Sequence, residues 1–259
     1  MRGVRKMAIT IAISNQKGGV SKTTLTFNLA HVLASEGYKT LMIDFDPQGS
    51  LTEIVDPQEL QLDVFTALEF PDCAEGAIVP VTDDLDLMVG GINLSAFEIT
   101  YGQKEGRENM LRTTIGEIQN RYDFILIDCP PSLGMLLVNA LNAADCVVIP
   151  TATQYLSYKA FELLLMSIAE VKENLNPKLN ILGVVASMHD NRTLHNREVL
   201  EKISEEFDVL GIVGSSTKVN DATMAGLPLY KYDKNHKIAK EYEKIARRLI
   251  NYGKKQNIS

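Results

Sequence analysis

Short, continuous apolar runs recur along the chain and alternate with longer amphipathic segments. The runs are rich in Ile, Val and Leu, and they lack the apolar–polar alternation of a strand that has one face in water. They are MAITIAIS, KTLMIDF, DFILIDC, DCVVIP and LNILGVVAS. The pattern therefore predicts strands that are covered on both faces.

The segments between these runs show the apolar spacing of amphipathic helices. We expect helices at 22–36, 104–120, 133–143, 155–175 and 193–207. Strands and helices that alternate in this way imply right-handed crossovers. The sequence therefore predicts a three-layer α/β fold, with a mostly parallel central sheet and helices on both faces. In such a sheet, ligands bind at the carboxyl ends of the strands.

Residues 76–91 interrupt the alternation, because two short apolar runs flank an Asp-Asp turn there, and we expect a local excursion of the sheet. The sequence shows no internal repeat, low-complexity tract or linker that would divide it. A chain of 259 residues with 45% apolar composition is long enough for one large core. We expect a single domain over 1–259, with no helix-turn-helix DNA-binding domain before the first strand.

The net charge of −7 argues against a protein coated in nucleic acid, but the charge is unevenly distributed. Residues 231–255 contain nine Lys or Arg and three Asp or Glu, a balance of +6, so the other residues sum to −13. This basic end is either a localised binding face or a solvated helix with i,i+4 ion pairs.

The three cysteines lie far apart, which suggests neither a disulfide framework nor a zinc site and fits a reducing cytosol. The apolar stretch near the start is too short to span a membrane.

The stretch NQKGGVSKTT directly follows the first apolar run and precedes an apolar helical segment. Gly18 and Gly19 allow backbone N–H groups to turn toward an anion, and the helix N-terminus adds its dipole. Lys22 is placed to reach the β and γ phosphates, and Thr23 to ligate magnesium. The order of strand, loop and helix therefore predicts a phosphate-binding loop.

This stretch resembles the deviant Walker A motif of the ParA/MinD family of ATPases, K-G-G-x-x-K-[ST]-[ST]. The family usually has glycine at the position of Ser21, and we expect nucleotide binding to survive the serine. In that family the early lysine, which matches Lys17, reaches across a dimer interface to the phosphates bound by the other subunit. The resemblance implies ATP as the nucleotide and the following contacts to it: Lys17, Gly18, Gly19, Val20, Ser21, Lys22, Thr23 and Thr24.

The resemblance continues at two acidic strand ends. In LMIDFDPQGSLT, Asp46 matches the carboxylate that orients the attacking water, and Asp44 the one that supports the magnesium shell. In FILIDCPPSLG, Asp128 matches the carboxylate that holds magnesium through water. Carboxylates at the end of a buried strand are costly unless a cation or hydrogen-bond donors compensate them, which favours a functional interpretation. The expected metal site is Thr23, Asp44 and Asp128 with Mg²⁺.

Phosphoryl transfer depends mainly on positioning and charge stabilisation. Lys17, Lys22 and Asp46 are the expected catalytic residues. We expect a magnesium-dependent ATP hydrolase that is weak alone, because Lys17 acts only from a partner, and that is stimulated by a protein partner and by DNA.

Two later segments resemble those of chromosomal and plasmid partition ATPases. MHDNRT is similar to M-[YF]-D-x-R-T, and KVNDATMAGLPLYKYD to R-L-S-E-A-P-x-x-G-x-P-x-x-x-Y-D. The arginines of these segments contact DNA nonspecifically in that subgroup, and they correspond here to Arg192 and Lys218. The family's residues near the adenine and its alanine-proline step are replaced here, so the adenine contacts are not assigned. The family's proline and arginine before this segment are Gly214 and Ser215 here, and its alanine-proline step is Ala222 and Thr223.

The last amphipathic segment has an apolar stripe that we expect to pack on the body of the protein. The stripe comprises Ile238, Tyr242, Ile245, Leu249 and Tyr252. Its basic face, with Lys237, Arg247 and Arg248, is a candidate extension of the DNA-binding patch. The segment lacks the bulky Phe/Leu-rich face of a membrane-targeting helix, so no membrane partner is expected.

The resemblance thus implies an ATP-dependent homodimer that binds double-stranded DNA nonspecifically and partitions a plasmid or chromosome with a ParB-type centromere-binding protein. Such a protein is cytoplasmic and associated with the nucleoid. Two alternatives stay open: a MinD-like ATPase that positions membrane components or cargo, and a nucleotide-dependent binding module with negligible hydrolysis.

Overall fold

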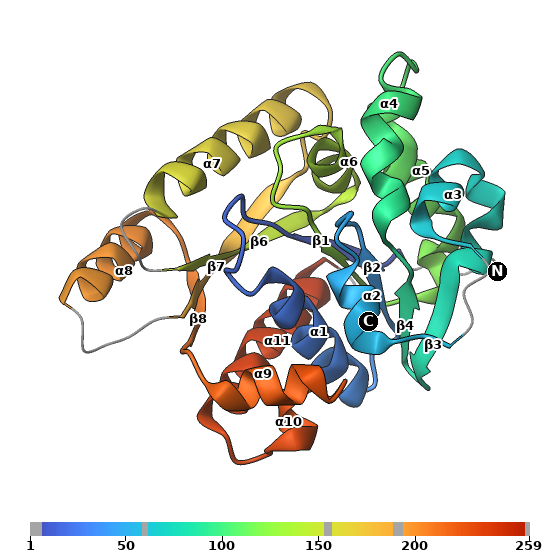
Figure 1. Ribbon diagram of the computed structural model, residues 1–259. Coiled ribbons are helices and arrows are strands. Elements are labelled where there is room, and N and C mark those ends of the chain that lie inside the picture. Colours follow the sequence, from blue (N-terminus) through green and yellow to red (C-terminus); the bar gives the residue numbers. More distant parts are fainter. Residues whose placement is uncertain (1–6, 59–61, 153–156, 189–193, 257–259) are drawn as a thin grey trace.

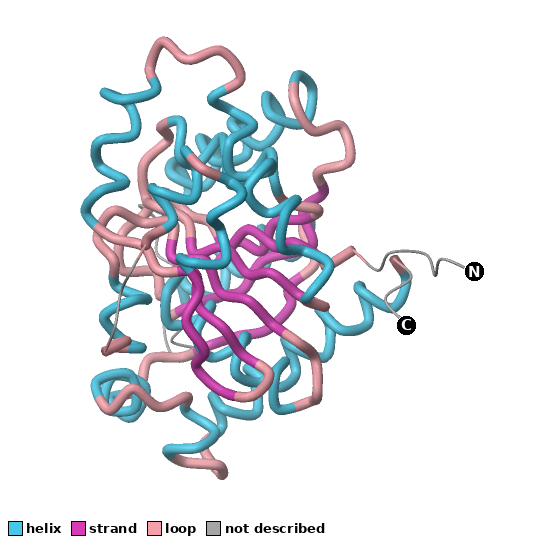
Figure 2. Tube along the Cα trace, turned by 90° about the vertical axis from the view of Figure 1, so that its right-hand side faces the viewer, coloured by secondary structure: helices cyan, strands magenta, loops and turns pink. Residues whose placement is uncertain are grey.

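One eight-stranded sheet forms the centre of the molecule (Figures 1 and 2), in the order β3-β4-β2-β5-β1-β6-β7-β8. The computed structural model describes residues 7–58, 62–152, 157–188 and 194–256. The strands are β1 (Ile9–Ile13), β2 (Thr40–Asp44), β3 (Ile78–Thr82), β4 (Leu85–Met88), β5 (Phe124–Asp128), β6 (Cys146–Ala152), β7 (Asn180–Ser187) and β8 (Val209–Val213). Every neighbouring pair is parallel except the β3–β4 hairpin.

Helices cover both faces of this sheet, as Figure 1 shows. One layer contains α1 (Lys22–Ser35), α2 (Ser50–Val55), α9 (Thr217–Met224), α10 (Leu229–Tyr232) and α11 (Lys237–Lys255). The other contains α3 (Val64–Glu69), α4 (Phe97–Tyr101), α5 (Met110–Ile118), α6 (Met135–Ala143), α7 (Ser157–Asn174) and α8 (Leu194–Glu206). Four 3₁₀ turns among the described residues complete the connections: η1 (Pro71–Ala77), η2 (Ile92–Ala96), η3 (Arg107–Asn109) and η4 (Gln119–Arg121). The predicted three-layer α/β fold is confirmed.

The central strands are mostly apolar on both sides because their two faces enter two different cores. On β1, Ile11 and Ile13 pack under α1 and α11, whereas Ala12 faces the core beneath α5, α6 and α7. Successive side chains of a strand point to opposite faces, so a strand covered on both sides needs an apolar residue at every position. This explains the five continuous runs, which are β1, β2, β5, β6 and β7.

Differences from the sequence-based expectations lie in the short elements. The excursion at 76–91 is the β3–β4 hairpin, with Asp83 and Asp84 at its turn. The helix expected from 104 begins only at Met110, after the 3₁₀ turn η3. Strand β8 was not anticipated, nor were the short helices α2, α3, α4, α9 and α10.

Helix α11 runs from the carboxyl edge of the sheet to its amino edge. Its first turn lies beside Ser216, which follows β8, because the Ser216 Oγ and His236 Nε2 atoms are 3.2 Å apart. Three turns later, the Arg248 Nη1 atom donates a hydrogen bond to the carbonyl of Val209, the first residue of β8, at 3.3 Å. The predicted apolar stripe is confirmed: Ile238, Tyr242, Ile245 and Leu249 are buried, and Tyr252 is partly buried.

Candidate nucleotide-binding site

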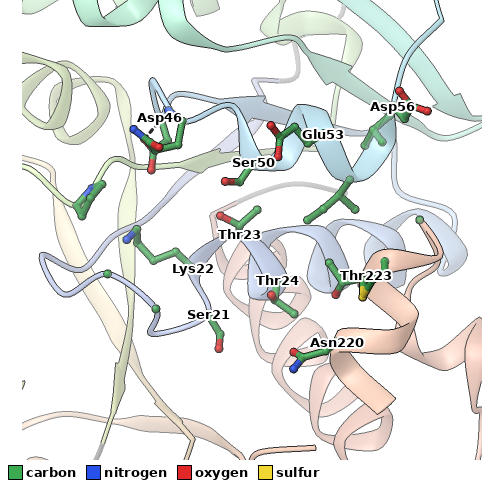
Figure 3. A pocket seen from close by; sticks show the side chains of 18 of the residues that line it. Ser21, Lys22, Thr23, Thr24, Asp46, Ser50, Glu53, Asp56, Asn220 and Thr223 are labelled. Atoms are coloured by element: carbon green, nitrogen blue, oxygen red, sulfur yellow. Dashed lines mark hydrogen bonds between the residues drawn. The ribbon is translucent and has the colours of Figure 1, made fainter. Parts of the chain in front are cut away.

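A cavity of about 1040 Å³ opens at the carboxyl edge of the sheet, beside the first turn of α1 (Figure 3). Three segments form most of its lining: the loop after β1 with the start of α1, the segment from β2 through α2, and α9 with the two residues after it. Pro131, after β5, and Met188, after β7, complete the lining. Lining residues that the sequence had singled out are Gly18, Gly19, Ser21, Lys22, Thr23, Thr24 and Asp46. The structure therefore brings most of the predicted phosphate-binding residues to one cavity, large enough for a nucleotide.

The loop after β1 is held in place by Asn15. Its Nδ2 atom donates to the carbonyl of Pro150 at 2.6 Å, and its Oδ1 atom accepts from the backbone N–H of Lys17 at 2.9 Å. Asn15 thereby fixes the start of the loop against β6. Backbone amides in such a loop can then be directed at an anion without further rearrangement.

Ser21 occupies a backbone conformation that suits glycine. Its φ is +67°, in the left-handed region, and it stands at the N-cap of α1 without a capping hydrogen bond from its side chain. A residue with a Cβ pays about 1–2 kcal/mol for this conformation. The usual glycine at this position of the motif is therefore explained by backbone geometry.

The two lysines of the loop differ in placement. Lys22 is 7% exposed and lines the cavity, and in Figure 3 it shares this space with Thr23, Asp46 and Ser50. Lys17 is half-buried and is absent from the residues that line the cavity. Of the two lysines, only Lys22 is therefore among the residues that line the cavity.

Asp44 and Asp128 are acidic residues at the ends of two strands beside the loop. They are paired positions of the parallel strands β2 and β5, and both are buried. Burial raises the pKa of Asp44 to about 6, although two hydrogen bonds from Thr52 oppose this shift. Burial also raises the pKa of Asp128 to about 8, against the opposing influence of Thr23 and Lys22 nearby. Taking a carboxylate out of water disfavours its charged form, and a second carboxylate alongside adds to the effect.

Asp128 has the properties expected of a carboxylate that binds a cation. No hydrogen bond of ordinary geometry reaches either of its carboxylate oxygens from the described part of the chain. A buried, unpartnered carboxylate is costly, and a bound cation removes that cost. Thr23, Asp44 and Asp128 therefore fit a magnesium ion that completes its shell with phosphate oxygens and water. Among the described residues, no group of three or more His, Cys, Asp or Glu is arranged to hold a metal without such help.

Asp46 lies two residues beyond Asp44, in the cavity and partly exposed. Its Oδ1 atom accepts from the backbone N–H of Gln48 at 3.0 Å, drawn as a dashed line in Figure 3. Its own N–H points to Asp44 Oδ1 at 3.4 Å. The side chain therefore has a defined orientation and an accessible oxygen, as positioning a water molecule requires.

The basic residues predicted to contact DNA do not form one cluster. Lys218, at the start of α9, is ion-paired with Asp233 at 2.5 Å, and Lys237 begins α11 at the same edge of the sheet. Arg247 and Arg248 lie just past the middle of α11, about 15 Å along its axis from Lys237, where Arg248 reaches the start of β8. Arg248 pairs with Asp208 there. The proposed extension of the patch along α11 is thus divided between two edges, and Arg192 lies outside the described residues.

Several cavity residues were not identified from the sequence. The β2–α2 segment adds Gln48, Ser50 and Glu53, and α9 adds Asn220 and Thr223. Ser50 belongs to the quoted acidic motif, so its proximity to Asp46 was a usable signal. Helix α9 lies in the segment that resembles the partition ATPases and directly follows Gly214 and Ser215, which match family positions near the adenine, so this resemblance was the usable signal for its contribution.

The chain is similar in sequence to known proteins. A family model described as an AAA domain matches residues 8–181, more than half of the chain. The chromosome-partitioning ATPase Soj of Treponema pallidum is 35% identical over 254 residues, which cover 94% of this chain and 98% of that protein.

Two solved structures share the fold over nearly the whole chain. A cobyrinic acid a,c-diamide synthase from Mycobacterium smegmatis, with bound ATP analogue and magnesium, has a TM-score of 0.84 and 29% identity, covering 96% of this chain and 97% of the other. A plasmid partition protein from Borrelia burgdorferi, bound to AMPPNP, has a TM-score of 0.79 and 26% identity, covering 95% and 99%. The two are named for different activities, so shared architecture alone does not separate partition from ligation.

None of the helices within the described residues is both long and apolar enough to cross a bilayer.

Proposed function

Because the chain belongs to the ParA/MinD family of ATPases, we propose that it is a partition ATPase whose ATP-bound dimer binds DNA nonspecifically and releases it after hydrolysis. A ParB-type protein bound at a centromere is the proposed partner that triggers hydrolysis. The similarity to a chromosome-partitioning ATPase and to a plasmid partition protein supports this proposal. The homodimer, the DNA and the nucleoid are parts of the same proposal.

The proposal rests on helix α9, which has residues at the nucleotide cavity and a basic residue at the surface. Asn220 and Thr223 of α9 line the nucleotide cavity, whereas Lys218, in the first turn of the same short helix, stands at the surface and is paired with Asp233. A displacement of α9 by bound nucleotide therefore also displaces the lysine that the family resemblance assigns to DNA. A rigid helix with one group at each site is a simple physical means of coupling the two ligands.

The residues of the cavity have separate roles in the proposed hydrolysis. The amides of the loop and Lys22 bind the β and γ phosphates, and Lys17 of a second protomer neutralises charge that develops on the γ phosphate. Asp46 orients the attacking water. Thr23, Asp44 and Asp128 would hold a magnesium ion, which would supply positive charge against the phosphates. Since Lys17 is supplied by the second protomer, turnover of an isolated protomer is slow.

A co-sedimentation experiment separates this function from membrane positioning. The protein is mixed with plasmid DNA or with anionic liposomes, each with ATP, with ADP and without nucleotide. We expect ATP-dependent sedimentation with DNA, which falls steeply with added salt because phosphate contacts release counterions. ATP-dependent sedimentation with liposomes but not with DNA contradicts the proposal and supports a MinD-like role.

Measured turnover separates the proposal from a binding module without hydrolysis. ATP hydrolysis is assayed with and without DNA, and in Asp46→Ala, which removes the carboxylate that orients water. We expect turnover that depends on Asp46. Turnover that survives Asp46→Ala contradicts the catalytic assignment, and a wild-type protein without turnover supports the binding module.

A further inference from the structure

Thr52, a residue of α2 without an assigned role, binds back to Asp44 and so closes the segment between them into a loop. Thr52 donates twice to the same oxygen of Asp44: its backbone N–H reaches Oδ2 at 2.8 Å and its hydroxyl reaches Oδ2 at 2.7 Å. Asp44 is fully buried. We propose that Thr52 is a positioning residue that holds Asp44 in the orientation needed for magnesium, and this inference rests on the proposed nucleotide function.

The groups around the Thr52 hydroxyl determine the direction in which its proton points. Besides its contact with Asp44, it lies 3.1 Å from the backbone N of Gly90 and 3.3 Å from the carbonyl O of Gly90. A hydroxyl has one proton to donate. The Gly90 N–H needs an acceptor and the Asp44 carboxylate needs a donor, so the proton points to Asp44 and a lone pair receives the Gly90 N–H. The methyl-bearing side chain is therefore fixed between β2 and the end of β4.

Gly90 shows how tightly this junction is assembled. A Cβ atom at this position would lie 1.9 Å from the carbonyl oxygen of Asp44, so only glycine fits there. Backbone contact at that distance cannot relax through side-chain movement. Thr52 is thus held by its contacts with Gly90, and its two hydrogen bonds hold the Asp44 carboxylate in turn.

As a consequence, the two carboxylate oxygens of Asp44 differ in their hydrogen bonds. Oδ2 accepts both bonds from Thr52, whereas Oδ1 has, from the described residues, a long contact of 3.4 Å with the N–H of Asp46. Oδ1 is therefore the oxygen nearer to Asp46, and it is the one that we assign to magnesium. The same two bonds close the loop from Asp44 to Thr52, within which Asp46 lies, so Thr52 also restricts where Asp46 can point.

A comparison of Thr52→Val with Thr52→Ser tests this role. Valine keeps the shape and removes the hydroxyl, whereas serine keeps the hydroxyl. The readout is the affinity for a fluorescent ATP analogue, measured with Mg²⁺ and with EDTA, and the result is the ratio of the two dissociation constants. Loss of a group that orients a metal ligand typically costs 10–100-fold in metal affinity.

We expect Thr52→Val to lower the magnesium-dependent gain in affinity at least roughly tenfold while it changes affinity in EDTA little, and Thr52→Ser to restore the gain. A purely structural role would change the melting temperature and both affinities together. If Thr52→Val does not fold, Thr52→Cys, whose thiol is a weak donor, gives the same test.

Two results overturn the inference. One is a Thr52→Val protein with the wild-type ratio, and the other is a wild-type protein whose nucleotide affinity does not respond to Mg²⁺. Both are independent of DNA. A protein that binds Mg-ATP through Thr52 but ignores DNA contradicts the proposed partition function and leaves this inference intact.

Discussion

Asp44 and Asp128 face each other as register partners on the parallel strands β2 and β5, so two buried carboxyl groups leave the sheet side by side. Nearby Asp44 adds to the raised pKa of Asp128, whose dominant cause is burial. In the nucleotide-free protein this pair is therefore a local instability. A site that is costly when empty gains stability from its ligand, because the ligand binds only the folded state.

The pair predicts the pH dependence of stability in the absence of nucleotide and magnesium. The folded-state pKa values of about 6 and about 8 exceed the ordinary value of 3.8. As the pH rises above 4, the unfolded chain loses these protons first, so the pair destabilises the folded state progressively up to about pH 8. We expect Asp128→Asn to be more stable than wild type by on the order of 1–3 kcal/mol at pH 8, with a smaller difference at pH 5.

Urea denaturation of both proteins at matched pH values measures this difference. The comparison cancels other titrating groups, such as buried His31, whose pKa is lowered to about 4, so that it destabilises the fold as the pH falls below 6.5. An Asp128→Asn protein that is less stable than wild type at pH 8 would show that the carboxylate is already compensated in the free protein.

The positive φ of Ser21 predicts a stabilising substitution. Ser21→Gly relieves the left-handed strain but increases the freedom of the unfolded chain, so we expect a net gain of about 0.5–1 kcal/mol. Ser21→Ala is the control, since it keeps the strain and removes only the hydroxyl. The free energy of unfolding from denaturant titration decides, and equal stability of the glycine and alanine variants would refute the strain.

The ion pair between Lys218 and Asp233 predicts a change in DNA binding. Asp233 competes with DNA phosphates for Lys218, so Asp233→Asn is expected to strengthen binding to nonspecific duplex DNA roughly two- to fivefold at low salt. Asp221→Asn removes the same charge from an exposed position of α9 and serves as the matched control. Fluorescence anisotropy measures both variants. Equal effects of Asp233→Asn and Asp221→Asn would mean that net charge alone matters. If Asp233→Asn no longer strengthens binding when it is combined with Lys218→Ala, the pairing is confirmed.

Glu98 predicts a stability effect at the helix that follows the Asp128 strand. Gly134 stands at the N-cap of α6 without a side chain to cap it, and Glu98 Oε1 accepts from the N–H of Met135 at 2.7 Å instead. We expect Glu98→Ala to cost about 1 kcal/mol, in the range of a lost N-cap. Glu105→Ala, at an exposed position nearby, is the control, and thermal denaturation provides the comparison.

Sequence reasoning succeeded where one local pattern has one structural meaning. Buried parallel strands need apolar residues on both faces, so β1 and β5 were recognisable, and the acidic residues that end such strands had to meet at one edge. The strand β8 was missed because its run is short and includes Gly211, which packs against Ile245 of α11, and a glycine weakens the strand pattern.

Contacts that depend on turns or on distant segments could not be predicted in this way. Thr52 meets Asp44 because Gly49, with a φ of +66°, reverses the chain before α2, and composition does not give that angle. Helix α9 reaches the cavity because Gly226 lies against α2, where a Cβ atom would stand 3.2 Å from the carbonyl oxygen of Ile54. The periodicity of α11 gave its buried face correctly, but the path of the helix across the sheet placed Lys237 and Arg248 at opposite edges.

We propose that Lys17 completes the phosphate site of the neighbouring protomer. A mixture of two inactive variants tests it most directly. Lys17→Ala keeps its own Asp46, and Asp46→Ala keeps its own Lys17, so a mixed dimer contains one complete site only if Lys17 acts across the interface.

We expect each variant alone to be nearly inactive and the equimolar mixture to recover roughly a quarter of wild-type ATP turnover, because half of randomly formed dimers are mixed and each has one complete site of two. A mixture that is no more active than the separate variants, although both bind ATP and dimerise, would contradict the claim and place Lys17 in its own protomer's site.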